Sequence, residues 1–250
     1  MRKCIWCQRT ENETPFEKKA HTIPKSLGGK RICKNVCDSC NHYFGSPKPN
    51  EPAPELVLKE ILNISKFYLL KSVNVKTTRY KSVYFKINFE TFKIKLKLKY
   101  SFKVGYQEML GRQFRKGIYK VFLEERELQL GDSLDPRFNF IREFARYGIG
   151  DSPVYIQIPK FRMAVFSLPD IQHPQIRFTE ESNKQDQEFR VYSYMLMGHN
   201  FLIPTSLIFN DICIEKYKNY LKQSNNPFGQ IIKEIKFAED IDYHFSNLND

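Results

Sequence analysis

Two Cys-x-x-Cys pairs near the N-terminus, Cys4/Cys7 and Cys37/Cys40, constrain the fold of this chain more than any other feature. Thiolates are soft ligands, and two such pairs are typical of tetrahedral zinc with sulfur ligands at about 2.3 Å. A segment of fewer than about fifty residues buries little core, so a structural metal would supply the missing stability. We therefore predict that these four cysteines hold a structural Zn2+, with a set of buried thiols as the alternative.

The other two cysteines are not needed for a four-thiolate site. Cys33 lies four residues before Cys37 and could replace one ligand, but we assign it to packing or to a free thiol. Cys213 stands alone in an apolar context, so we expect it in the core. The N-terminus has no apolar stretch of signal-peptide length, and no window approaches the roughly 18–20 apolar residues of a membrane span. We expect a cytoplasmic protein with reduced cysteines and no membrane partner.

The chain is strongly basic, with a formal net charge of +12 over 250 residues. Residues 1–50 hold ten Lys and Arg against four Asp and Glu, which is half of the net charge. Such a balance favours a polyanionic partner, either nucleic acid or an anionic membrane surface, over a merely basic soluble protein. The hydrophobic share of 41% allows a substantial core and argues against a disordered or fibrous chain.

The pattern along the chain predicts an α+β protein with a small N-terminal module, residues 1–50, and a larger mixed α+β domain, residues 51–250. A proline-rich segment, residues 46–54, separates the two. Helical periodicity and end signals predict helices at 54–71, 106–128, 136–148 and 211–222. Alternating or apolar runs predict strands at 82–90, 91–103, 154–158, 162–168, 175–178 and 188–198. Pro204 makes 201–206 an edge or irregular strand, and we expect the acidic tail from Glu239 to be peripheral.

Basic side chains recur on several of these predicted elements. In the strand 91–103 the lysines alternate with apolar residues, and in the helix 106–128 they recur at helical spacing. We assign phosphate contacts to Lys25, Lys30, Lys93, Lys95, Lys97, Lys99, Arg112, Arg115 and Lys116, with Lys120 on the same helix face. The alternatives are a solvated helix face and a row of lysines that guards a sheet edge against pairing.

Between the two cysteine pairs lies His21, followed by Thr22, Ile23 and Pro24, and then by Gly28-Gly29. A closed four-thiolate zinc site does no chemistry, so any catalysis must come from residues that the zinc holds in place. A lone histidine more often packs or lies on the surface than acts as a base. Its position between the cysteine pairs favours a functional role here.

The stretch from residue 4 to about residue 46 resembles the HNH endonucleases, which have the ββα-metal nuclease fold. The motifs CIWC, HTIP, LGG, CDSCN and YFG stand in the order that this family shows. The resemblance implies that His21 is the general base, which takes a proton from the attacking water. It also implies one catalytic divalent ion, Mg2+ or Mn2+, beside the scissile phosphate.

The resemblance places Asn41 at a position that binds this catalytic ion, at the start of a helix. A helix cap is the other reading of Asn41. His42 is a second candidate for the same role, and Asn35 is the candidate for the middle Asn of the family name. Many family members carry an acidic metal ligand directly before the catalytic histidine, where this chain has Ala20. The metal would then be held by fewer ligands, with Asn41, His42 or Glu17 helping.

We therefore expect a metal-dependent HNH endonuclease whose substrate is DNA, double-stranded rather than single-stranded, with RNA as the less favoured alternative. The resemblance suggests a role in restriction of foreign DNA or phage defence, with a homodimer or a defence-system partner protein as associates. One alternative is a catalytically weak or inactive zinc-clip protein that only binds nucleic acid. Another is an effector subunit that cuts after a partner or signal binds the C-terminal domain.

Overall fold

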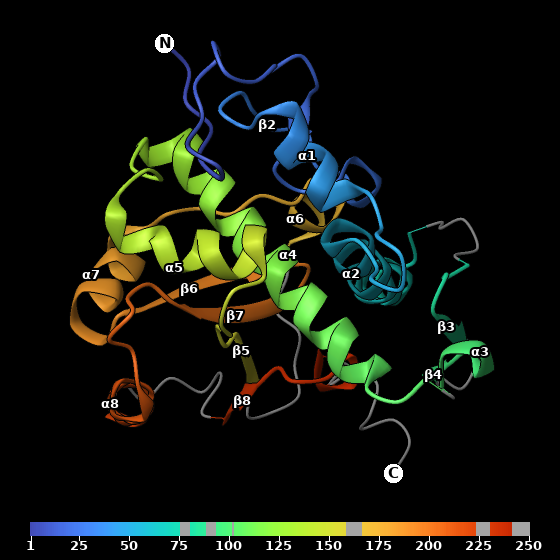
Figure 1. Ribbon diagram of the computed structural model, residues 1–250. Coiled ribbons are helices and arrows are strands. Elements are labelled where there is room, and N and C mark those ends of the chain that lie inside the picture. The colour runs from blue at the N-terminus through green and yellow to red at the C-terminus, as the bar shows by residue number, and fades with distance from the viewer. Residues whose placement is uncertain (76–80, 89–93, 102, 159–166, 224–230, 242–250) are drawn as a thin grey trace.

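The computed structural model describes residues 1–75, 81–88, 94–101, 103–158, 167–223 and 231–241. The long helix α4 (Tyr106–Leu130) runs through the middle of the molecule, with the N-terminal segment against one side and a sheet along another (Figure 1). Helices and strands are mixed along the chain, which confirms the predicted α+β class. None of the helices in the described residues is long and apolar enough to span a lipid bilayer.

Helix α4 confirms the prediction for 106–128 and ends two residues later. It stops at Gly131, whose φ of 69° is left-handed and whose N–H donates to the carbonyls of Arg126 and Glu127. Apolar side chains on several of its faces are fully buried, among them Leu110, Phe114, Ile118, Val121 and Phe122. The helix is therefore surrounded by other elements rather than lying at the surface of the fold.

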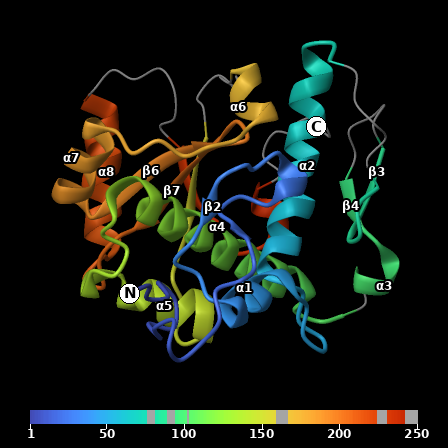
Figure 2. The same cartoon turned by 90° about the horizontal axis from the view of Figure 1, so that it is seen from above.

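Helix α2 (Pro54–Ser72) crosses α4 and packs against it (Figure 2), and this helix confirms the prediction for 54–71. Pro54 occupies the first turn, where its missing N–H costs no hydrogen bond. A Cβ on Gly117 of α4 would lie 3.0 Å from Leu58 Cβ and 3.1 Å from the Pro54 carbonyl oxygen. Glycine at this position therefore lets the two helices approach closely (Figure 2).

The sheet has four antiparallel strands in the order β6-β7-β5-β8. They are β5 (Tyr155–Ile158), β6 (Val191–Leu196), β7 (His199–Pro204) and β8 (Ile231–Glu234). On one face Tyr192 and Tyr194 join the main core, and Tyr194 donates to the Ile118 carbonyl of α4 at 3.2 Å. On the other face Val191 and Leu202 pack against Tyr217 of α8 (Asp211–Gln223), which confirms the predicted helix 211–222.

Several strand predictions in this half of the chain differ from the structure, in whole or in part. Residues 175–178 form no strand, and residues 188–189 end a helix, α7 (Glu180–Phe189), that the sequence analysis missed. Strand β7 is central rather than an edge, because Pro204 is its last residue and leaves the rest of the strand free to pair on both sides. The predicted strand 162–168 lies largely outside the described residues, and Leu168 begins α6 (Leu168–Gln172).

The segment between α2 and α4 also differs from its prediction. A short antiparallel hairpin forms there from β3 (Phe85–Ile87) and β4 (Ile94–Leu96), as expected for the pair 82–90 and 91–103. The second strand is far shorter than predicted, however, because a helical turn, α3 (Leu98–Ser101), follows it. Tyr100 packs on Tyr106 with stacked rings 4.9 Å apart, so local aromatic packing outweighs the alternating pattern.

After α4 the chain forms one continuous helical segment, as predicted for 136–148. It consists of a 3-10 turn, η2 (Pro136–Phe138), then α5 (Asn139–Arg142) and a π-helical turn, η3 (Glu143–Tyr147). The chain's final described turn is η4 (Ala238–Ile241). Asp240 and Ile241 are buried there, so the tail is not peripheral at its start; residues 242–250 lie outside the described residues.

The N-terminal segment contains two short strands and a helix in the order ββα. Strands β1 (Ala20–His21) and β2 (Ile32–Cys33) pair antiparallel, η1 (Lys25–Leu27) lies between them, and α1 (Asp38–Gly45) follows. The apolar core of this segment is continuous with that of α2 and α4. Trp6, which is almost fully buried, packs on Phe44 and donates to Glu124 of α4 at 3.1 Å.

Candidate active site and zinc clip

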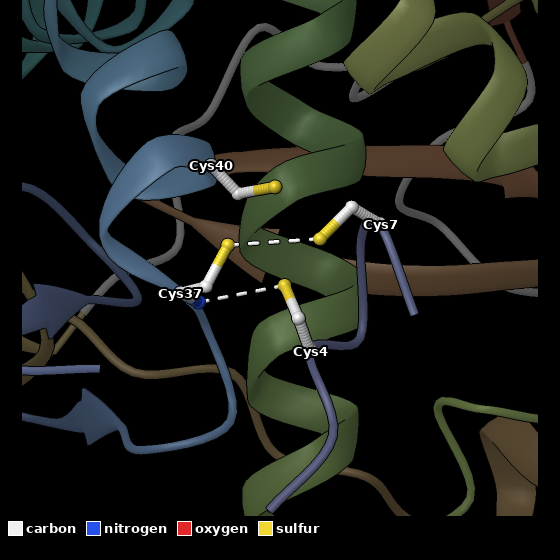
Figure 3. Close-up of side chains that lie close together, drawn as sticks. All are labelled: Cys4, Cys7, Cys37 and Cys40. Atoms are coloured by element: carbon white, nitrogen blue, oxygen red, sulfur yellow. Dashed lines mark hydrogen bonds between the residues drawn. The ribbon is translucent and has the colours of Figure 1, made fainter. Parts of the chain in front are cut away.

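The four cysteines of the two Cys-x-x-Cys pairs converge at the start of α1 (Figure 3). Their sulfur atoms all lie within 4.8 Å of one another, and Cys7 Sγ is 3.6 Å from Cys37 Sγ. Two sulfur ligands that lie about 2.3 Å from a tetrahedral zinc ion are nearly as far apart as Cys7 Sγ and Cys37 Sγ are here. All four are free cysteines, so they fit a zinc clip, as the sequence predicts.

Neighbouring groups complement the charge that four thiolates would carry. Arg146 of η3 donates from Nε to Cys40 Sγ at 3.2 Å, and the backbone N–H of Cys37 donates to Cys4 Sγ at 3.4 Å. Cys33 lies outside this cluster in β2, where burial raises the pKa of its thiol and favours the neutral form. Cys213 is only half-buried, so the prediction that it lies in the core is only partly correct.

Strand β1 presents His21 and Ala20 to opposite sides. Successive side chains of a strand alternate between its faces, so Ala20 is fully buried in the core while His21 is partly exposed. The residue before His21 therefore points away from the space that the imidazole reaches. Pairing of Ala20 with Cys33 and of His21 with Ile32 fixes this alternation.

A cavity of about 340 Å³ opens beside His21 and Asn41. Four elements contribute to it: β1 with the residue before it, η1, α1 and the first turns of α2. Its lining comprises Lys19, His21, Pro24, Lys25, Ser26, Asn41, Gly45, Glu55, Leu56 and Lys59. The structure thus brings together three residues that the sequence analysis singled out, His21, Asn41 and Lys25.

The Gly-Gly pair after the His-x-x-Pro motif sets the path of the chain around this cavity. Gly28 has φ of 101°, and a Cβ there would lie 2.1 Å from the Gln172 carbonyl oxygen of α6. Lys66 of α2 donates to the Leu27 carbonyl at 2.7 Å, which ties η1 to α2. These contacts fix the end of η1, the turn that begins with the cavity residue Lys25.

Residues 4–51 match the family model described as HNH endonuclease. The N-terminal segment is an HNH endonuclease domain. Comparisons with curated proteins and with solved structures each found no match for this chain. The matched region ends before α2, so three cavity residues, Glu55, Leu56 and Lys59, come from outside the HNH domain as the family model bounds it.

The cavity of the HNH domain carries an excess of positive charge. Three lysines line it, Lys19, Lys25 and Lys59, against the single carboxylate of Glu55 among its lining residues. Neither Lys19 nor Lys59 was singled out from the sequence. The spacing of Glu55 and Lys59 was an available signal, because side chains four residues apart lie on the same face of a helix.

Other predicted site residues do not line the cavity. His42 is exposed, and its Nδ1 lies 3.0 Å from Ser46 Oγ in the next turn of α1. Lys30 Nζ lies 3.3 Å from His173 Nε2, and Asn35 donates to Glu127 of α4 at 2.6 Å. Asn35 therefore joins the HNH domain to α4 and takes no part in the cavity.

The basic face predicted on α4 is largely buried, which corrects the sequence analysis. Arg115 and Lys116 are buried: Arg115 pairs with Asp151 at 2.8 Å and Lys116 with Glu51 at 3.3 Å. Arg112, which is partly exposed, also pairs with Asp151, at 2.9 Å. Acidic groups from other segments thus neutralise these cations, which leaves them little freedom to bind phosphate.

The lysines of the predicted strand 91–103 also fail to form one row. Lys93 lies outside the described residues, Lys95 is exposed in β4, and Lys99 lies in α3 with its Nζ 4.6 Å from the centre of the Tyr100 ring. Lys97 donates to the Ser82 carbonyl at 2.6 Å. Because α3 interrupts the strand, the alternation on which the prediction rested ends at Leu96.

Lys120 of α4 is fully buried at the junction between the HNH domain and α2. Its Nζ lies 2.7 Å from Glu55 Oε1 and 2.9 Å from Glu124 Oε2, and it donates to the carbonyls of His21 and Thr22. Burial alone would lower the pKa of Lys120, but Glu124 and Glu55 outweigh it and raise that pKa. Burial raises the pKa of Glu124 to about 7, although Lys120 opposes the shift.

Proposed function

We propose that this protein is a metal-dependent endonuclease that hydrolyses phosphodiester bonds of DNA. The observation that supports the proposal is the shared cavity of the HNH domain, which places His21 and Asn41 beside Lys19, Lys25 and Lys59. A histidine and a hydrogen-bonding amide within a basic cavity suit a substrate that is a phosphate diester.

His21 is the general base in this proposal. His21 lines the cavity, and Lys120 of α4 donates a hydrogen bond to the backbone carbonyl of His21. This bond ties β1 to α4. A neutral imidazole accepts a proton from a water molecule as that water attacks phosphorus. The new bond joins the water oxygen to phosphorus, and the bond from phosphorus to the 3′-oxygen breaks.

The donor atoms in the cavity fit a hard divalent cation. Asn41 offers an amide oxygen and Glu55 a carboxylate oxygen, and oxygen donors are those that Mg2+ and Mn2+ prefer. Such an ion, when bound, neutralises charge that develops on the phosphate and on the leaving oxygen. The lysines would contact flanking phosphates, which supplies affinity without reading the base sequence.

Substitution of His21 tests the proposal directly. Supercoiled plasmid incubated with Mg2+ or Mn2+ should be nicked by the wild type, and His21→Ala should lower the rate by roughly 10²- to 10⁴-fold. His173→Ala is the matched control, because His173 is exposed and does not line the cavity. Circular dichroism and zinc content should be unchanged in both variants.

The same experiment separates the alternative functions. No nicking by the wild type with any tested metal, together with intact DNA binding, would favour a zinc-clip protein that only binds nucleic acid. Nicking that starts only after a partner is added would favour a regulated effector. Cleavage of both strands by a protein with one cavity per chain often takes two copies, so we extend the proposal to a homodimer acting on duplex DNA. Restriction of foreign DNA remains a hypothesis from the family resemblance.

A further inference from the structure

The cavity beside His21 contains a carboxylate that the HNH domain itself does not supply. Ala20, the residue before His21, is fully buried and faces the core. Glu17, the nearest acidic residue before it, is exposed and does not line the cavity. Among the lining residues of the described chain, Glu55 is the one acidic side chain. It stands in the first turn of α2, after the matched domain has ended.

We propose that Glu55 is the acidic ligand of the divalent ion in this cavity, an inference that rests on the proposed nuclease function. Glu55 and Asn41 reach the same cavity from two different helices, α2 and α1. Together with His21 on β1 they place a base, an amide oxygen and a carboxylate around one space. The amide and carboxylate oxygens would suit a single Mg2+ or Mn2+, and the imidazole would serve as the base.

The two oxygens of Glu55 have different surroundings. Oε1 is held 2.7 Å from the buried Nζ of Lys120. Oε2 lies on the side of α1, because a Cβ placed on Gly45 would be 3.5 Å from it. No hydrogen bond to Oε2 occurs among the described residues. One oxygen therefore fixes the carboxylate, and the other is available to a cation.

Lys120 makes this arrangement more specific than an isolated ion pair. The same ammonium group donates to the His21 carbonyl and binds Glu55, so the predicted base and the predicted ligand share one buried anchor on α4. The Glu55 side chain is 22% exposed, which keeps the carboxylate within reach of solvent. A carboxylate serving only to neutralise Lys120 would not need this access, since Glu124 does so while fully buried.

The test compares Glu55→Gln with Glu51→Gln. Glu51 also pairs with a lysine, Lys116, at 3.3 Å, but it does not line the cavity. Binding of Mn2+ to the zinc-loaded protein is measured by calorimetry, beside plasmid nicking over a Mn2+ series. Loss of a ligand oxygen's charge should weaken Mn2+ binding by roughly tenfold or more in Glu55→Gln. Glu51→Gln should bind Mn2+ as the wild type does.

A second measurement needs no variant and covers the case in which Glu55→Gln fails to fold. Mn2+ added to the zinc-loaded wild type should broaden the amide resonances of Glu55 and Asn41 before those of Glu51. Wild-type Mn2+ affinity in a folded Glu55→Gln, no detectable Mn2+ binding by the wild type, or broadening elsewhere would each overturn the inference.

The outcomes keep the inference and the proposed function apart. If the wild type nicks DNA and depends on His21 while Glu55→Gln binds Mn2+ normally, the nuclease function stands and Glu55 is only a partner of Lys120. If Mn2+ binding depends on Glu55 but no variant nicks DNA, the ligand assignment stands and the nuclease function falls.

Discussion

Two groups of basic side chains in this protein look alike in the sequence and differ in the structure. Lys19, Lys25 and Lys59 line an open cavity with one carboxylate among its lining residues. On α4, by contrast, Lys116 and Lys120 have side chains that are 4% and 0% exposed, and acidic groups from distant segments pair with both. The first group is available to a polyanion, whereas the second holds the fold together.

The difference shows what charge spacing in a sequence does and does not determine. Helical spacing correctly predicts that the α4 cations share a face, but it does not show what covers that face. Glu51 from the segment before α2, and Glu55 from α2 itself, cover it here. Long-range packing, which brings those acids to α4, therefore decides which basic residues can contact phosphate.

Loss of zinc should have the largest effect on the difference between the cavity lysines and the buried lysines of α4. Cys37→Ser removes one of four thiolates, and structural zinc contributes on the order of 10 kcal/mol to the folding of small modules. We expect the HNH domain to release its metal and lose order, so the lysines around the cavity no longer converge. Zinc release to a colorimetric chelator and hydrogen exchange of residues 1–50 measure this.

The sheet provides the internal control for that variant. Amides of β5, β6 and β7 should stay protected in Cys37→Ser, because these strands pair with one another and Phe122 of α4 packs on Tyr192 of β6 with ring centres 5.5 Å apart. Equal loss of protection throughout the chain would contradict the division into residues 1–50 and 51–250. The continuous core at Trp6 and Phe44 would then make the molecule one folding unit.

Removal of the buried ammonium should have the next largest effect. Lys120→Met leaves Glu55 and Glu124 without their shared cation, and such a change typically costs about 3–5 kcal/mol. Arg112→Met, at the partly exposed end of the same helix face, should cost about 1 kcal/mol or less. Urea denaturation followed by tryptophan fluorescence reports both, since Trp6 contacts Glu124. Equal costs would mean that burial does not distinguish the two cations.

The zinc clip and the main helices were predictable because their signals are local. Cysteine spacing alone identifies the ligands Cys4, Cys7, Cys37 and Cys40, and α2 and α4 follow from apolar periodicity with Pro54 and Gly131 at their ends. Strand β8 and helix α7 were missed because neither carries a comparable pattern. In α7 the residues are mostly polar, and only Asp186 and Phe189 are buried.

The candidate site was predictable only where one short segment builds it. His21 and Asn41 lie in the HNH motifs, and the cavity includes both. The spacing of Glu55 and Lys59 places them on one helix face, but it does not show that this face meets the cavity, which depends on α2 packing beside α1 and α4. His42 follows Asn41 directly, but one residue step turns a side chain by about 100° on a helix, and His42 accordingly lies off the cavity.

The smallest effect we expect is on the salt dependence of DNA binding, and it tests the comparison most directly. Each phosphate contact adds about 0.9 to the slope of log affinity against log salt concentration. Lys59→Gln should therefore flatten the slope by about 1, because Lys59 lines the cavity and its nearest acid, Glu60, is 3.8 Å away. Arg112→Gln should leave the slope unchanged, because Asp151 already neutralises that guanidinium. Fluorescence anisotropy with a labelled duplex and zinc-loaded protein, in buffer without added Mg2+ or Mn2+ so that cleavage does not occur, gives both slopes. If only Arg112→Gln flattened the slope, the phosphate-binding surface would lie on α4 and not at the cavity.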